Sequence, residues 1–80
     1  MKAQLIFDLD EPLDQAAHMR AVKATDMAVV LWDMDQYLRG LIKYAPDIMN
    51  PEVYSTLEEV RDKLHQLMNE RVVDLDELLK

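Results

Sequence analysis

The feature that most constrains this chain is a run of apolar residues in the stretch 26–44, where they recur at alternating steps of four and three. The run consists of Met27, Leu31, Met34, Leu38 and Leu41. This spacing places the five side chains along one side of an α-helix, and it is typical of a helix that packs lengthwise against another helix. The stretch therefore predicts a long amphipathic helix as the organising element of the fold.

The apolar side of this helix is wider than a single helical neighbour requires. At about 100° per residue, further apolar side chains extend the stripe to roughly 160° of the circumference. They are Val30, Tyr37, Ile42 and Tyr44. Because a seam against one partner is narrower than that, we expect this helix to contact two neighbours, from its own chain or from another.

A second seam with the same period follows a short break. Pro46 ends the first helix because the residue before a proline avoids helical angles, and Asn50 with Pro51 forms a helix start. The second seam consists of Val53, Leu57, Val60, Leu64 and Leu67. Two seams of matching period joined by a short loop predict an antiparallel helical hairpin, with helices at 26–44 and 51–70.

The N-terminal segment differs in pattern from the rest of the chain. Residues 3–9 alternate partly between apolar and polar side chains, which predicts an extended arm over 1–10. We expect Phe7 and Leu5 to cover the wide helix. Pairing of this segment between two copies of the chain is the alternative.

A shorter helix precedes the central one. Asp10 is a suitable cap and Pro12 is tolerated in a first helical turn, so we expect a helix at 11–23. Asp26 is a suitable cap for the helix that follows. No Gly or Pro separates the two helices, however, and one continuous helix over 12–44 is an open alternative.

The chain closes with a short helical turn, which we expect at 74–79. The predicted fold class is therefore all-α: an antiparallel helical hairpin with an extra N-terminal helix and an extended N-terminal arm. Residues 1–80 form a single domain in this interpretation, because so short a chain has room for one core.

Composition limits how such a chain can be stabilised and what it can bind. A chain of 80 residues buries only about 60–65% of its unfolded surface. The sequence has no cysteine, which excludes disulfides and Cys-based zinc sites. Oligomerisation is the remaining support, so we expect a homo-oligomer. The net charge of −7 opposes binding to nucleic acid or to an anionic membrane. No apolar run reaches the roughly 20 residues that span a bilayer, and we expect a cytoplasmic protein.

One motif suggests chemistry: Asp8 and Asp10 follow an apolar segment. The pair resembles the first motif of haloacid-dehalogenase-type phosphatases, in which the first Asp is the nucleophile and the second is the acid or base. Glu11 and Pro12 replace the Gly-Thr that follows in that family, and the added carboxylate would repel a phosphate. A short helical chain also has no room for the parallel sheet that holds this motif. We therefore expect no enzymatic activity, no catalytic residue and no bound cofactor or metal.

Charged pairs are expected on the exposed sides of both long helices. Asp35 stands four residues before Arg39, and Glu59 stands four before Lys63. Each such pair stabilises a helix by only a few tenths of a kcal/mol, about 0.2–0.5. His65 is expected at the surface or at the rim of a packed side.

The aromatic residues are the candidates for an interaction surface. Trp32 lies on the side of its helix away from the seam, next to Arg39. A large aromatic on a polar side is either covered by another segment or exposed as a binding anchor. We expect coverage by the N-terminal arm or by a second subunit. The candidate interaction residues are Trp32, Tyr37, Arg39, Tyr44, Tyr54 and Phe7.

Four segments resemble a group of small proteins encoded by tailed phages and prophages. They are Phe7-Asp8-Leu9-Asp10-x-Pro12, Lys23-x-x-Asp26-Met27-Ala28, Leu31-Trp32-x-x-Asp35-Gln36-Tyr37-Leu38-Arg39 and Asp74-Leu75-Asp76-Glu77-Leu78. That group has no assigned activity, so the resemblance implies a setting, the cytoplasm of a phage-infected bacterium, and no mechanism. Its members often carry Gly between the last long helix and the terminal segment, where this chain has Arg71 and Val72.

These observations predict a non-enzymatic helical interaction module. It would self-associate through the wide side of the central helix, with Trp32, Tyr37 and Arg39 in the interface. In a phage setting it would bind a host protein or sequester a small ligand between subunits. The alternative function is that of an acidic protein that mimics nucleic acid and inhibits a host enzyme.

Overall fold

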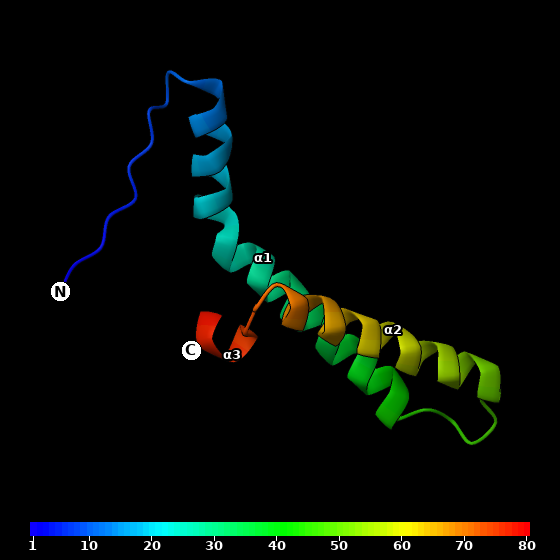
Figure 1. Ribbon diagram of the computed structural model, residues 1–80. Coiled ribbons are helices and arrows are strands. Elements are labelled where there is room, and N and C mark those ends of the chain that lie inside the picture. Colours follow the sequence, from blue (N-terminus) through cyan, green and yellow to red (C-terminus); the bar gives the residue numbers. More distant parts are fainter.

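The computed structural model describes all 80 residues and contains three helices and no strand. They are α1 (Pro12–Lys43), α2 (Pro51–Glu70) and α3 (Leu75–Leu78). The two long helices contact each other, and Figure 1 shows α2 running back alongside the C-terminal half of α1. The prediction of an all-α chain is confirmed. None of the three helices combines the length and the apolarity that crossing a bilayer requires.

α1 is one continuous helix of 32 residues, so the prediction of separate helices at 11–23 and 26–44 is wrong. Asp26, the expected cap of a second helix, lies inside α1. Extending an existing helix adds one hydrogen bond for each residue that becomes ordered, whereas starting a new helix orders several residues for its first bond. With no Gly or Pro near Asp26, the chain therefore continues as a helix. Figure 1 shows α1 changing direction between its N-terminal turns, in blue to cyan, and its green C-terminal half.

The start of α1 is organised by the turn that precedes it. The helix cap is Glu11, whose side chain makes no capping bond, and not Asp10 as expected. The Asp8 carboxylate instead accepts a hydrogen bond from the Asp10 backbone N–H at 3.0 Å. The Asp14 carboxylate accepts from the Asp8 N–H at 2.8 Å, and the Gln15 side chain donates to a backbone carbonyl of this turn. The Asp8 side chain therefore stabilises a tight turn, as aspartates often do.

Residues 1–8 form neither helix nor strand. The Phe7 ring lies edge-on to His18, in the early turns of α1, with 5.5 Å between ring centroids. Leu5 is 79% exposed. The expectation that Phe7 and Leu5 cover the central stretch 26–44 is therefore wrong. The turn before α1 directs the segment along the N-terminal end of the helix, which explains why it meets His18 (Figure 1).

α2 begins and ends with well-defined caps. Pro51 is its first residue, and the Asn50 side chain accepts from the Glu52 N–H at 2.8 Å. At the other end, the Val73 N–H donates to the Met68 carbonyl at 2.8 Å, and the Val72 N–H donates to the Asn69 carbonyl at 3.1 Å. These two bonds define a Schellman motif, which turns the chain sharply after a helix.

The left-handed position of this motif is occupied by Val72, with φ of 55°. Glycine is the usual residue at this position. After it, the Asp74 carboxylate accepts from the N–H groups of Asp76 and Glu77 and so starts α3.

The chain buries very little of itself. Only Ala28, Leu38, Leu75 and Asp35 are buried. The accessible surface is 7077 Å², whereas a folded monomer of 9.4 kDa exposes about 5,000 Å². The radius of gyration is 17.7 Å, against about 12 Å for a compact domain of this length. The single chain is therefore elongated and has a minimal core.

Candidate functional site

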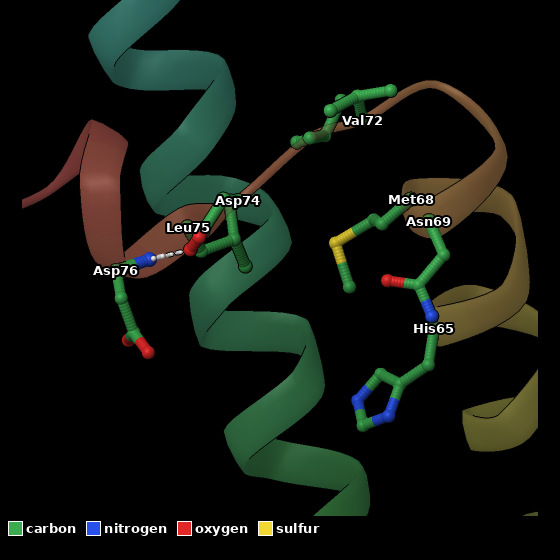
Figure 2. Close-up of a pocket in the computed structure, with 8 residues that line it drawn as sticks. His65, Met68, Asn69, Val72, Asp74, Leu75 and Asp76 are labelled. Carbon is green, nitrogen blue, oxygen red and sulfur yellow. Dashed lines mark hydrogen bonds between the residues drawn. The ribbon is translucent and has the colours of Figure 1, made fainter.

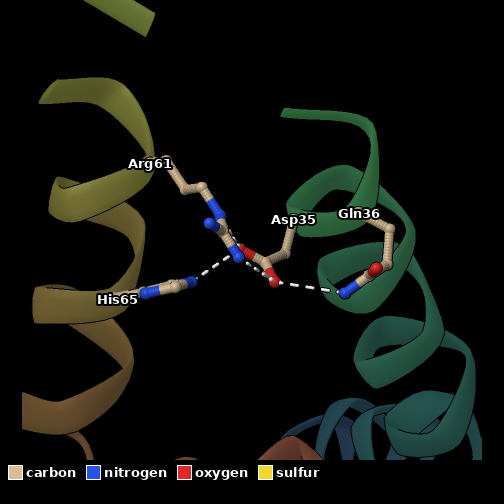
Figure 3. Close-up of polar contacts among 4 residues, drawn as sticks. All are labelled: Asp35, Gln36, Arg61 and His65. Atoms are coloured by element: carbon tan, nitrogen blue, oxygen red, sulfur yellow. Dashed lines mark hydrogen bonds and ion pairs between the residues drawn. The ribbon is translucent and has the colours of Figure 1, made fainter. Parts of the chain in front are cut away.

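The most buried polar group of the molecule is the Asp35 carboxylate, on the side of α1 that faces α2. Arg61 Nε lies 3.0 Å from Asp35 Oδ1, and His65 Nε2 lies 2.6 Å from the same oxygen (Figure 3). The Gln36 amide lies 3.5 Å from Oδ2. Arg61 and His65 are four residues apart and so project from the same side of α2. This Asp35 cluster joins the two long helices.

The expected surface pair of Asp35 with Arg39 is therefore wrong. Asp35 stands four residues after Leu31 and three before Leu38, which places it within the apolar seam. Arg61 stands in the same way between Leu57 and Leu64 of α2. The signal that identifies the cluster is this pair of opposite charges at equivalent seam positions, which becomes visible when the two seams are compared.

The ionised form of Asp35 is favoured in this cluster. Burial by itself raises the pKa of Asp35, but the hydrogen bonds and charges of Arg61 and His65 outweigh that effect, and the pKa lies below the ordinary carboxyl value. Since an ionised carboxylate only accepts hydrogen bonds, His65 donates from Nε2. The only serine, Ser55, stands ten residues before His65 on α2, about 15 Å along the helix. The Asp35–His65 pair thus has no serine nucleophile beside it.

An open hollow of about 470 Å³ lies between the end of α2 and α3 (Figure 2). It is lined by His65, Met68, Asn69, Val72, Val73, Asp74, Leu75 and Asp76. Its two best-placed polar groups are already engaged, because His65 contacts Asp35 and Asp74 caps α3. Nowhere in the chain do three His, Asp or Glu side chains gather closely enough to hold a metal ion.

Trp32 is 40% exposed and borders a second hollow with α3 and the residues that follow it. α3 contacts α1, and its Leu75 is buried. The C-terminal segment therefore provides the neighbour that was expected from the N-terminal arm or a second subunit. The sequence could not assign this role to α3, because a four-residue helix carries almost no periodicity of its own.

α1 carries a second row of apolar side chains that the rest of the chain leaves largely uncovered. This α1 stripe consists of Met27, Val30, Met34, Tyr37, Leu41 and Tyr44. Its steps alternate between three and four, as in a coiled coil. Leu41 is half-buried and the other five are exposed, with Tyr37 at 63% and Tyr44 at 75%. α1 thus contacts two neighbours, α2 and α3, as expected from its width, and both leave this stripe largely exposed.

α2 carries a matching row on its own free side. This α2 stripe consists of Val53, Val60 and Leu67, spaced by seven and each about half exposed. Each stripe is rotated by about a quarter turn, in the same sense, from the side on which its helix contacts the other. Because the helices run in opposite directions (Figure 1), equal rotations point to the same side of the pair. The α1 and α2 stripes together form one apolar face.

The candidate interaction residues on α1 fall on two sides of the helix. Tyr37 and Tyr44 belong to the apolar face. Trp32 and Arg39 are separated from Tyr37 by about 140° and 160° around the helix axis. A single partner helix does not reach both sides, and so Trp32 and Arg39 do not share one helix-packing surface with Tyr37.

The other two candidates have local neighbours. Tyr54, at the start of α2, borders a shallow hollow beside the interhelical loop, together with Ile42 and Met49. Phe7 packs on His18. The residues that sequence reasoning missed as interaction candidates are those of the α2 stripe, for which the seven-residue spacing of Val53, Val60 and Leu67 is the available signal.

Comparison with known protein families, with curated proteins and with solved structures gives no match for this chain. The class of protein to which the chain belongs is therefore described from its own fold and contacts. It is an all-α chain in which two long helices are joined through a buried carboxylate and expose an apolar face.

Proposed function

We propose that this chain is a non-enzymatic helical protein-interaction module that self-associates through its apolar face. The associating unit is the antiparallel helical hairpin of α1 and α2, and residues 1–10 form an arm outside it. The observation that carries the proposal is the α1 stripe, a row of six apolar residues in coiled-coil spacing of which five are exposed. Soluble monomers rarely expose a continuous apolar patch larger than a few hundred Å².

The accessible area supports a second copy as the occupant of this face. The chain exposes 7077 Å², about 2,000 Å² more than a compact monomer of its mass. A standard protein interface covers about 800 Å² on each partner. The excess surface is therefore ample for a stable homodimer, which would supply the core that a single copy lacks.

The Asp35 cluster supports the same function from inside the hairpin. Its donors and acceptors satisfy one another, and the protein has no buried polar side-chain atom without a partner. A polar contact within an apolar seam favours one pairing of two helices over others. The cluster would then hold α1 and α2 in the arrangement that aligns their stripes.

The resemblance to small phage proteins suggests where such a module would act. In the cytoplasm of an infected bacterium, it would bind a host protein or enclose a small ligand between its subunits. Trp32 and Arg39, on the side away from the apolar face, remain accessible for a host partner when the chain is self-associated.

Light scattering on matched variants tests self-association. Val30 lies in the apolar face and Val22 lies outside it, and their exposures are similar at 65% and 59%. We expect Val30→Glu to convert the oligomer to a monomer, because it would bury an unpaired carboxylate. Val22→Glu should leave the molar mass unchanged. A monomeric wild-type chain at high concentration, or equal dissociation by the two variants, would refute the proposal.

The alternative, an acidic mimic of nucleic acid, is favoured by one observation. All five carboxylates of α2 are exposed, on Glu52, Glu58, Glu59, Asp62 and Glu70. Binding through them would weaken steeply as salt rises, whereas binding through an apolar or aromatic surface would not. The mimic would be favoured if the chain captures a host enzyme at low salt and loses it at moderate salt. The Val30→Glu variant should then capture the enzyme as well as the wild type does.

A further inference from the structure

We infer that the second copy docks with its α2 stripe against the α1 stripe, so that two hairpins form a four-helix bundle whose two-fold axis runs parallel to the helices. The inference rests on the proposed self-association and adds which surfaces meet. It follows from three features: the heights of the stripe residues along the helices, the sizes of their side chains, and two charges that flank them.

The Asp35 cluster sets which residues of α1 and α2 lie at the same height. Asp35 contacts both Arg61 and His65, so it lies level with the turn between them. Because α2 runs back along α1, a step forward on α1 corresponds to a step backward on α2. The resulting level pairs of stripe residues are Val30 with Leu67, Tyr37 with Val60, and Tyr44 with Val53.

Two symmetric arrangements can bury the apolar face against its own copy. With the two-fold axis parallel to the helices, each α1 stripe meets the α2 stripe of the second copy at the same height. With the axis perpendicular to the helices, α1 meets α1 and α2 meets α2. The level pairs are in contact across the interface only in the parallel arrangement.

Side-chain size favours the parallel arrangement. There Tyr37 meets Val60 of the second copy and Tyr44 meets Val53, so a large side chain always faces a small one. With a perpendicular axis at the level of Tyr37 and Val60, Tyr37 faces Tyr37 of the second copy and Val60 faces Val60, so the interface is crowded at one position and has a void at the other. Close packing requires large and small side chains to alternate across an interface, since crowding and voids both destabilise it.

Charge supports the same arrangement. Asp33 flanks the α1 stripe and Lys63 flanks the α2 stripe, and neither takes part in any of the four ion pairs of the chain. The expected pair of Glu59 with Lys63 is absent, which leaves the lysine free. Asp33 and Lys63 stand at nearly the same height, so the parallel arrangement places Asp33 opposite Lys63 of the second copy at the rim of the interface.

Disulfide cross-linking between two singly substituted chains tests this arrangement, because the natural sequence has no cysteine. A Tyr37→Cys chain is mixed with a ¹⁵N-labelled Val60→Cys chain, refolded together and oxidised. We expect a disulfide-linked mixed dimer, identified by mass, in large excess over either self-linked dimer, because a disulfide needs Cα atoms within about 7 Å. Val30→Cys mixed with Leu67→Cys should behave in the same way and covers the case in which loss of Tyr37 prevents folding.

A matched control and the light-scattering mass separate the possible failures. Val22→Cys, exposed but outside the apolar face, should give no mixed dimer with Val60→Cys. Self-linked Tyr37→Cys in excess, from a chain that scatters as a dimer, would overturn the parallel arrangement and leave self-association standing. A chain that scatters as a monomer and forms no cross-link would refute both proposals.

Discussion

Asp35 and Arg61 occupy equivalent positions in the seams of α1 and α2, and their side chains meet there with 3.0 Å between Oδ1 and Nε. Each replaces an apolar residue that the helical period would place at that position. The contact favours this pairing of the two helices, because sliding α2 by one turn would leave the buried Asp35 carboxylate with only one of its two partners, Arg61 or His65. The same contact sets the heights of the residues on the apolar face.

Truncation of Asp35 should therefore destabilise the protein much more than its small contact area suggests. We expect Asp35→Ala to lower the free energy of unfolding by about 2–4 kcal/mol, because it leaves the Arg61 guanidinium largely buried and unpaired. Replacement of both residues, Asp35→Leu with Arg61→Leu, should be close to neutral. Urea unfolding at a fixed chain concentration measures both. A double variant as unstable as the single one would show that the ion pair is not the source of the loss.

The Asp35 carboxylate should also make the stability of the protein depend on pH in the acid range. Its pKa is lower in the folded chain than the ordinary value of 3.8. The contribution of ionised Asp35 to the free energy of unfolding is therefore complete above the ordinary carboxyl pKa. It is lost as the pH falls from that value through the lower pKa of the folded state. We expect the stability difference between wild type and Asp35→Asn to shrink below about pH 4. Urea unfolding across the acid range checks this, and a difference that is independent of pH would exclude Asp35 as the titrating group.

The parts of the fold that local chemistry determines could be predicted from the sequence. The cap at Asn50 lies where the sequence suggests it, and α2 has the predicted bounds. The side of α1 that contacts α2 could not be predicted. Met27 and Met34 fit the predicted seam but are exposed, because periodicity shows which residues share a side and not which part of a wide stripe a neighbour covers.

The interactions between distant segments are the other part that the sequence does not determine. α3 reaches Trp32 because the chain turns sharply at Val72, and no local pattern predicts a left-handed valine. The continuity of α1 depends on a small balance between capping and helix extension at Asp26. The position of α3 and the continuity of α1 each result from competition between conformations of similar free energy. A pattern of residues does not show which of these conformations is more stable.

The left-handed valine gives a direct test of backbone strain. A β-branched residue at φ of 55° is unusual, and the left-handed conformation costs about 1–2 kcal/mol in a non-glycine residue. Val72 is 88% exposed, so its side chain contributes little packing. We expect Val72→Gly to raise the free energy of unfolding by about 1 kcal/mol, after allowing for the greater freedom of glycine in the unfolded chain. Thermal or urea unfolding measures it, and destabilisation would mean that the valine packs in a way its exposure does not indicate.

Docking of α3 on α1 can be followed through the only tryptophan. Trp32 borders the hollow formed by α3 and the residues after it, and Leu75 is the buried residue that holds α3 in place. Leu75→Ala should weaken that docking, because a buried Leu truncated to Ala typically costs 2–5 kcal/mol, and about the lower value applies to so small a core. We expect the fluorescence of Trp32 to shift to longer wavelength while circular dichroism of the long helices is unchanged. Leu78→Ala, in the same helix but 57% exposed, is the matched control and should leave the emission in place. If the two variants give the same emission, Leu75 is not what anchors α3.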